Sequence, residues 1–180
     1  MSTFFKNYFQ LIDNGNHSIE PSELILASEL INKVKNIGGT VFIIGNGGSA
    51  SIASHAAIDF TKAANIPATT FNESSLLTCF SNDYGYEHWV DKALESYAKE
   101  DDMVILISSS GQSQNIINGA KRARKMELPL ITFSGFSGQN KLREMGDVNL
   151  WIDSDKYNIV EIVHQNWILS IVDYLIEKNI

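Results

Sequence analysis

The chain has 180 residues, of which 44% are hydrophobic and 19% charged, and its formal net charge is −7. This composition is ordinary for a globular protein, and the length is that of one domain with a substantial core. The acidic balance argues against general binding to nucleic acid or to a membrane surface. A single cysteine, Cys79, excludes an internal disulfide and suits a reducing cytoplasm.

We expect no targeting segment and no membrane segment. The N-terminal stretch MSTFFKNYFQLIDNG lacks the basic start and the long apolar run of a signal peptide. No apolar stretch has the length that crosses a bilayer. The sequence therefore predicts a soluble cytoplasmic protein.

Apolar residues recur at helical spacing in some segments and run together in others. The run VFII, residues 41–44, fits a parallel strand that is covered on both faces. In chain order the patterns predict helix 4–12, helix 22–36, strand 40–45, helix 49–62, strand 68–71, helix 74–83, helix 86–98, strand 102–111, helix 113–126, strand 128–135, strand 149–153 and helix 158–178. This order predicts an open α/β sheet with helices on both faces.

Two predicted strands end in loops that are rich in glycine and serine: GNGGS at residues 45–49 and SSSGQS at residues 108–113. Ligands of such sheets bind beyond the carboxyl ends of the strands. There the N–H groups at a helix N-terminus favour a phosphate, glycine allows close approach, and serine adds donors. The loops lack the Gly-Lys-Ser/Thr ending of a P-loop and the spacing of a dinucleotide loop, so they indicate a sugar phosphate.

Either loop alone has a structural alternative. GNGGS can be an ordinary turn, and Ser113 can be the N-cap of the following helix. Two such loops at equivalent strand ends of one sheet favour phosphate binding.

Three segments then carry a resemblance: GNGGSASIASHAAIDFTK, SNDYGYE and ISSSGQSQNIINGAKRARKMELPLITFSG. They resemble the sugar isomerase (SIS) domain, and within it the phosphoheptose isomerases. These enzymes convert sedoheptulose 7-phosphate to glycero-manno-heptose 7-phosphate. The resemblance implies one SIS domain over residues 1–180, with N-terminal helices in 1–38 and an α/β core and C-terminal helix in 39–180. It also implies a five-stranded parallel sheet and a homotetramer with active sites between subunits.

The resemblance further implies where a sugar phosphate would bind. The substrate-binding positions that it carries over are Asn46, Gly47, Gly48, Ser49, Asn82, Asp83, Ser108, Ser109, Ser110 and Ser113. The four serines of the second loop match the family's phosphate cradle, with Ser109 where a threonine is common.

The catalytic positions depart from the family's pattern. The family has a histidine and, four residues later, a glutamate base, and here these are His55 and Asp59. Its final helix supplies a glutamine and, eight residues later, a histidine that acts in catalysis or binds zinc. An ungapped alignment puts Val160 and Ile168 at those positions, so both polar groups are absent.

The nearest substitutes on the final helix are Glu161, His164 and Gln165. Moving a carbonyl from C2 to C1 through an enediol takes a base and an acid. We expect Asp59 to be the base, beside His55, and His164 to be the partner acid. The same groups are suitable zinc ligands, so the metal requirement stays open. The structural alternatives are a core histidine beside Trp167 and a surface carboxylate at Asp59.

Three functions are therefore carried forward. The first is a phosphosugar aldose–ketose isomerase that acts on sedoheptulose 7-phosphate. The second is a sugar-phosphate sensor that binds without turnover. The third is a scaffold that resembles the SIS-family factor associated with the bacterial replication initiator, which a pull-down with the initiator would detect.

Overall fold

The computed structural model describes residues 2–178. Its elements are α1 (Ser2–Asn16), α2 (Pro21–Ile37), β1 (Val41–Gly45), α3 (Gly48–Lys62), β2 (Ala68–Thr69), α4 (Ser74–Tyr84), η1 (Tyr86–His88), α5 (Trp89–Tyr97), β3 (Met103–Ser108), α6 (Gln114–Lys125), β4 (Leu130–Ser134), η2 (Leu142–Glu144), β5 (Val148–Trp151) and α7 (Tyr157–Lys178).

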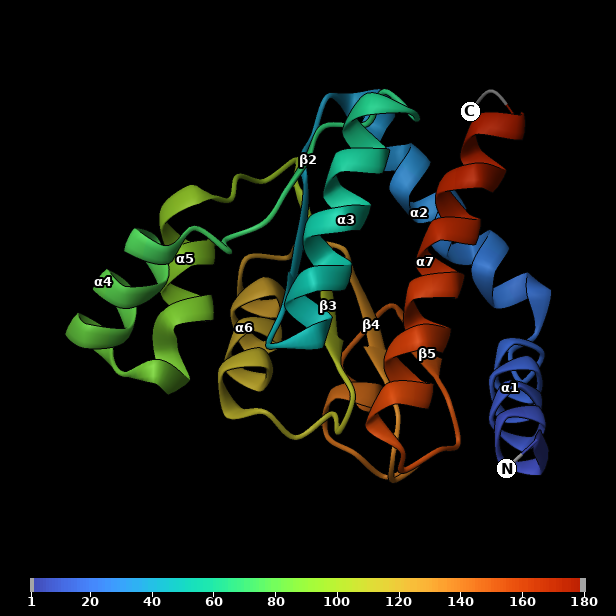
Figure 1. Cartoon of the computed structure of the whole chain (residues 1–180). Helices are drawn as coiled ribbons and strands as arrows, with labels where there is room; N and C mark the ends of the chain where they lie inside the picture. The colour runs from blue at the N-terminus through green and yellow to red at the C-terminus, as the bar shows by residue number, and fades with distance from the viewer. Residues whose placement is uncertain (1, 179–180) are drawn as a thin grey trace.

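The five strands form one sheet in the order β2-β1-β3-β4-β5. All four neighbouring pairs are parallel, which confirms the predicted five-stranded parallel sheet. Figure 1 shows α2, α3 and α7 on one side of this sheet and α4, α5 and α6 on the other. The central strands β1, β3 and β4 are buried along their whole length, as helices on both faces require.

Successive side chains of β1 enter two different hydrophobic cores. Val41 and Ile43 pack in the core that includes residues of α2, α3 and α7. Phe42 and Ile44 pack in the core that includes residues of α5 and α6. Because side chains of a strand alternate between the faces of the sheet, an unbroken apolar run is what two covered faces demand.

Helix α7 crosses the molecule against α1, α2 and α3. By length and composition it could span a membrane, and it is the one helix among residues 2–178 of which this is true. Half of its most apolar 18-residue stretch is buried inside the protein. In length and composition alone, α7 departs from the prediction that no apolar stretch reaches the length that crosses a bilayer. The contacts of α7 are those of a core helix in an α/β fold.

Candidate functional site

A small polar pocket lies where β1 and β3 end. Gly45 and Ile107 are partners in the parallel register, so the loops after the two strands leave the sheet side by side. The pocket has a volume of about 100 Å³, and its walls are Asn46, Ser49, Ile107, Ser108, Ser109, Ser110, Ser113, Tyr157 and Glu161. A larger hollow of about 380 Å³ lies between α3 and β2, but its walls are mostly apolar. The polar pocket is the one whose groups suit a phosphate.

The serines of the second loop leave donors free in this pocket. The Ser109 hydroxyl is buried and has no hydrogen-bond partner among the described residues. Ser113 occupies the N-cap position of α6, but its side chain makes no capping bond. Its hydroxyl instead accepts a long hydrogen bond of 3.4 Å from Ser108. The first N–H groups of α6 have no acceptor within the helix, so this end of the pocket presents several donors and a partial positive charge.

The GNGGS loop brings its backbone close to the pocket through two glycines. Gly47 has a φ of +55°, a conformation that side chains disfavour. Gly48 is the first residue of α3, and a Cβ there would collide with the carboxylate of Glu161 from α7. The loop therefore packs directly against α7, which supplies Tyr157 and Glu161 to the pocket.

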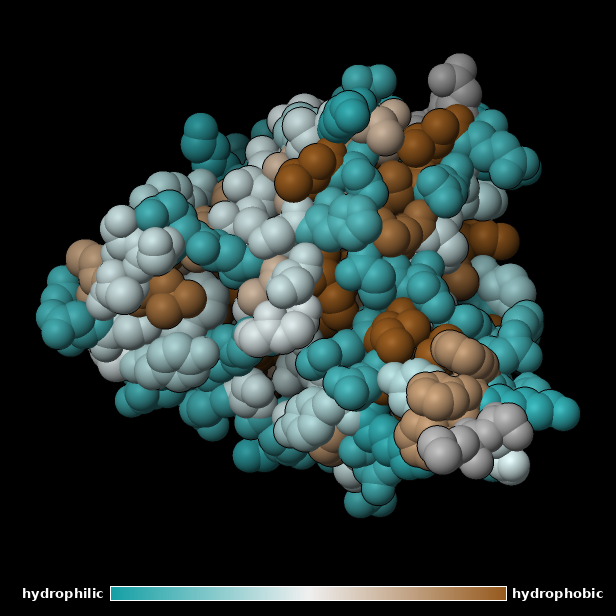
Figure 2. Space-filling model, viewed as in Figure 1, coloured by the Kyte–Doolittle hydropathy of each residue, from teal (hydrophilic) through white to brown (hydrophobic). Residues whose placement is uncertain are grey.

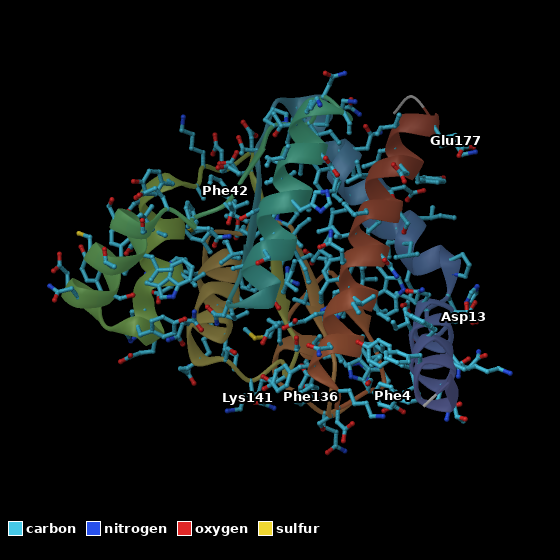
Figure 3. All side chains as sticks on the ribbon, viewed as in Figure 1. Phe4, Asp13, Phe42, Phe136, Lys141 and Glu177 are labelled. Atoms are coloured by element: carbon cyan, nitrogen blue, oxygen red, sulfur yellow. The ribbon has the colours of Figure 1, made fainter. Side chains whose placement is uncertain are left out.

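Tyr157 stands at the start of α7, beside the loop that follows β4. Its ring packs edge-on against Phe136, with ring centroids 4.8 Å apart. Phe136 is labelled in Figure 3, at the end of the molecule where α7 begins. This contact fixes one wall of the pocket.

Asn46 is held by two side chains, those of Asn115 and Tyr86. Its Oδ1 accepts from the Asn115 amide at 2.9 Å and from the Tyr86 hydroxyl at 3.1 Å. Its Nδ2 donates to Asn115 Oδ1 at 3.0 Å. An amide nitrogen carries two hydrogens, so one N–H of Asn46 remains for a ligand.

His55 and Asp59 lie further along α3 and form a chain with α7. The Gln165 amide nitrogen donates to His55 Nδ1 at 3.2 Å, which places the imidazole proton on Nε2. His55 Nε2 then donates to Asp59 Oδ2 at 3.1 Å. The side chains of His55 and Asp59 are 54% and 36% exposed, so the carboxylate is oriented and still accessible.

His164 does not reach this surface. It is fully buried, and its Nε2 donates to the Ser134 carbonyl at 3.1 Å. Burial lowers the pKa of His164 from 6.5 to about 4, so the ring is neutral near pH 7. The side chain points from α7 into the core, between Phe133 and Trp167. We therefore correct the sequence-based assignment and remove His164 from the acid–base pair.

Two other predicted residues also lie away from the pocket. Asn82 and Asp83 are on the exposed C-terminal turn of α4, where Asn82 donates to Asp83 at 2.9 Å. Neither lines the pocket within this chain. The structure thus brings together the two glycine- and serine-rich loops, but not the third segment.

The donor set of one chain does not fit a four-ligand zinc site. Val160 and Ile168 are buried apolar residues, and His164 is bonded to a backbone carbonyl. Within residues 2–178, no group of three or more His, Cys, Asp or Glu side chains is placed to hold a metal ion. We assign no step to a metal.

Sequence reasoning missed Tyr86, Asn115 and Tyr157. Tyr86 and Asn115 fall inside segments that resemble the family, but their bonds to Asn46 cross 40 and 69 residues of chain. No local spacing signals such pairs. Tyr157 is the first residue of α7, one residue before the predicted start of that helix.

The fold and the pocket define a class of protein. Residues 3–135 match the SIS domain, and the chain belongs to this family. The match ends before α7, the helix in which this chain departs from the family's catalytic pattern.

Relatives of nearly the same length narrow this class. The chain is 31% identical over 177 residues to a protein of Thermoplasma volcanium named probable phosphoheptose isomerase, covering 93% of this chain and 89% of that one. It is 32% identical over 180 residues to the protein of the same name from Thermoplasma acidophilum, covering 96% and 98%. These relatives confirm the resemblance and class the chain with the isomerases of the family.

Solved structures agree on the fold. The phosphoheptose isomerase GmhA from Neisseria gonorrhoeae superposes with a TM-score of 0.87 at 24% identity, over 97% of this chain and 96% of that one. A phosphoheptose isomerase from Francisella tularensis gives the same TM-score and identity, over 98% and 96%.

Proposed function

We propose that this protein is a phosphosugar aldose–ketose isomerase that converts sedoheptulose 7-phosphate to glycero-manno-heptose 7-phosphate. The observation that carries the proposal is the pocket at the ends of β1 and β3. There the buried Ser109 hydroxyl has no hydrogen-bond partner among residues 2–178, and the N-terminus of α6 has no side-chain cap, so both can donate hydrogen bonds to an anion. The choice of a heptose phosphate as the substrate comes from the relatives, which are named probable phosphoheptose isomerases.

The size of the pocket assigns the two ends of the substrate. A volume of about 100 Å³ suits the phosphoryl group, and the sugar chain extends outward from it. In a seven-carbon 7-phosphate, the reacting carbons C1 and C2 lie at the far end of that chain. His55 is seven residues after Gly48, or about 10 Å along α3, and Asp59 is eleven residues after it, or about 16 Å. The His55–Asp59 pair therefore lies beyond the phosphoryl pocket, in the direction in which this proposal extends the sugar chain.

Asp59 acts as the base in this proposal. Its carboxylate takes a proton from C1, the electron pair forms the C1–C2 double bond, and the C2 carbonyl oxygen takes up a proton to give the enediol. The O1 proton then leaves and C2 is protonated, so the carbonyl ends at C1. His55 bears a proton on Nε2 next to Asp59 and can exchange it with the substrate oxygens.

A second chain would close this open face. Large apolar side chains are exposed on α1 and α3, among them Phe4, Phe5, Phe9 and Ile58, at 60–66%. Figure 2 shows apolar patches over the side of the molecule formed by α3 and α7. We propose a cytoplasmic homotetramer in which such patches meet between subunits and bring the segment with Asn82 and Asp83 to a neighbouring site.

The decisive experiment is proton NMR of the purified protein with sedoheptulose 7-phosphate in D2O. An aldose product, or deuterium at C1 of the ketose, is the expected result. Line broadening of the sugar without exchange would instead mean a non-catalytic sensor. That alternative has one supporting observation, the buried apolar side chains at Val160 and Ile168.

A further inference from the structure

Glu161 places a negative charge in a pocket that otherwise suits an anion. It lies one turn after Tyr157 on α7, and its side chain lines the pocket together with the serines. Within residues 2–178 its carboxylate has no hydrogen bond or ion pair, and no lysine or arginine lines the pocket to neutralise it. A carboxylate at this position repels phosphate, so we ask what Glu161 contributes to the pocket.

Helix α3 explains how the carboxylate is tolerated. Glu161 lies against Gly48, the first residue of α3, so closely that a Cβ at Gly48 would collide with it. The N-terminus of a helix carries a partial positive charge that favours an anion. The two helix N-termini at the pocket therefore differ. The carboxylate of Glu161 lies at the N-terminus of α3, whereas the N-terminus of α6, beside Ser109 and Ser113, is open to a ligand.

The position of Glu161 also lies on the route of the sugar. Gln165, four residues later on the same face of α7, contacts His55 of the acid–base pair. A chain that runs from the α6 N-terminus towards Asp59 thus passes Glu161. A sugar phosphate has alcohol hydroxyl donors on the carbons of that stretch, whereas a simple phosphate ester such as methyl phosphate has no alcohol hydroxyl.

We propose that Glu161 is the specificity-determining residue of the phosphate pocket. Its carboxylate accepts hydrogen bonds from the sugar hydroxyls next to the phosphorylated carbon, and these bonds offset its repulsion of the phosphoryl group. A phosphate ester without such hydroxyls meets the repulsion alone, so the hydrogen bonds decide which ligand is preferred. This inference rests on the proposed function, because it takes the pocket to bind the phosphate of a sugar.

The test compares two ligands and two variants by isothermal titration calorimetry. The ligands are sedoheptulose 7-phosphate and methyl phosphate, which carries the same phosphoryl charge without hydroxyls. Glu161→Gln removes the charge and keeps the shape. The control is Glu177→Gln, the same change on the same helix about 24 Å further along, labelled at its other end in Figure 3.

We expect Glu161→Gln to tighten methyl phosphate binding, because the repulsion is gone. The repulsion acts on both ligands and cancels in the ratio of their Kd values. That ratio, methyl phosphate over sugar phosphate, should fall about tenfold, the effect of weakening one hydrogen bond to a charged group. Glu177→Gln should leave both Kd values unchanged.

The outcomes separate this inference from the proposed function. Wild-type protein that binds neither ligand would overturn both. Wild-type protein that binds both ligands, with an unchanged ratio in Glu161→Gln, would overturn the role of Glu161 alone. A lowered Tm with an unchanged ratio would reduce Glu161 to a stabilising contact at the α3 N-terminus.

Discussion

Replacing Ser109 with alanine should change binding and stability in opposite directions. The Ser109 hydroxyl is buried and has no hydrogen-bond partner among residues 2–178. Leaving a buried polar group unsatisfied costs about 1–3 kcal/mol, so removing this hydroxyl should stabilise the free protein or leave its stability unchanged. In the complex the same hydroxyl donates to a charged phosphate, a bond worth about 1.5–3 kcal/mol.

The size of both effects follows from these figures. A loss of about 1.5–3 kcal/mol raises the Kd for sedoheptulose 7-phosphate by roughly 10- to 100-fold, since 1.4 kcal/mol is a factor of ten. A gain of about 1 kcal/mol raises the Tm of a chain of this length by roughly 2–4 °C. Calorimetric titration and a thermal melt without ligand measure the two quantities on one preparation.

A matched control is available in Ser28→Ala. Ser28 is also buried, but its hydroxyl donates to the Leu24 carbonyl at 2.8 Å within α2, away from the pocket. We expect its Kd to equal that of the wild type. A Kd of Ser109→Ala within twofold of the wild-type value would show that the phosphate does not bind at this loop. A Tm lowered by several degrees would show that the hydroxyl already has a partner.

Three further predictions concern catalysis, positioning and pH. Asp59→Asn should lower kcat by about 10²–10⁴-fold, which is the usual contribution of a general base, and it should leave the Kd for the sugar phosphate within twofold of the wild-type value. Unchanged turnover in the NMR assay would show that Asp59 is not the base. Tyr86→Phe removes the hydroxyl that donates to Asn46, so it should raise KM about fivefold with little effect on kcat. A fall in kcat alone would mean that Tyr86 contacts the reacting atoms. Burial lowers the pKa of His164 to about 4 in the folded protein from the ordinary histidine value of 6.5, so between these values the unfolded chain binds more protons. Stability should therefore be full above pH 6.5 and fall by about 3 kcal/mol as the pH drops towards 4. Denaturant melts of His164→Gln should show a shallower decline over that window than wild type, and identical slopes would contradict the assignment.

The two glycine- and serine-rich loops show how far local sequence goes. An apolar run that ends in glycine and serine predicts a buried strand and a turn to a helix, because both are decided by nearest neighbours along the chain. Parallel strands then bring their carboxyl ends to one edge, so the partnership of residues 45–49 and 108–113 could be inferred before the structure. The boundaries of α3 and α6 agree with the predicted helices to within one or two residues.

Helix α7 shows where this reasoning stopped. Glu161, His164 and Gln165 are equivalent candidates in sequence, since all three lie within five consecutive residues. In the structure their side chains point in different directions, because each residue of an α-helix is rotated by 100° from the one before it. Glu161 and Gln165 face α3, and His164 faces the core.

The sequence by itself determined the class of fold and the strand-end loops, because apolar periodicity and turn residues act over short stretches of the chain. It also predicted a sugar phosphate as the ligand. Only the tertiary structure decided which side of α7 meets the pocket, that Asn46 is held by Tyr86 and Asn115, and that His164 is buried. These features depend on how a helix is rotated about its axis when it packs. That rotation is set by the sum of contacts over the whole core and not by any one motif.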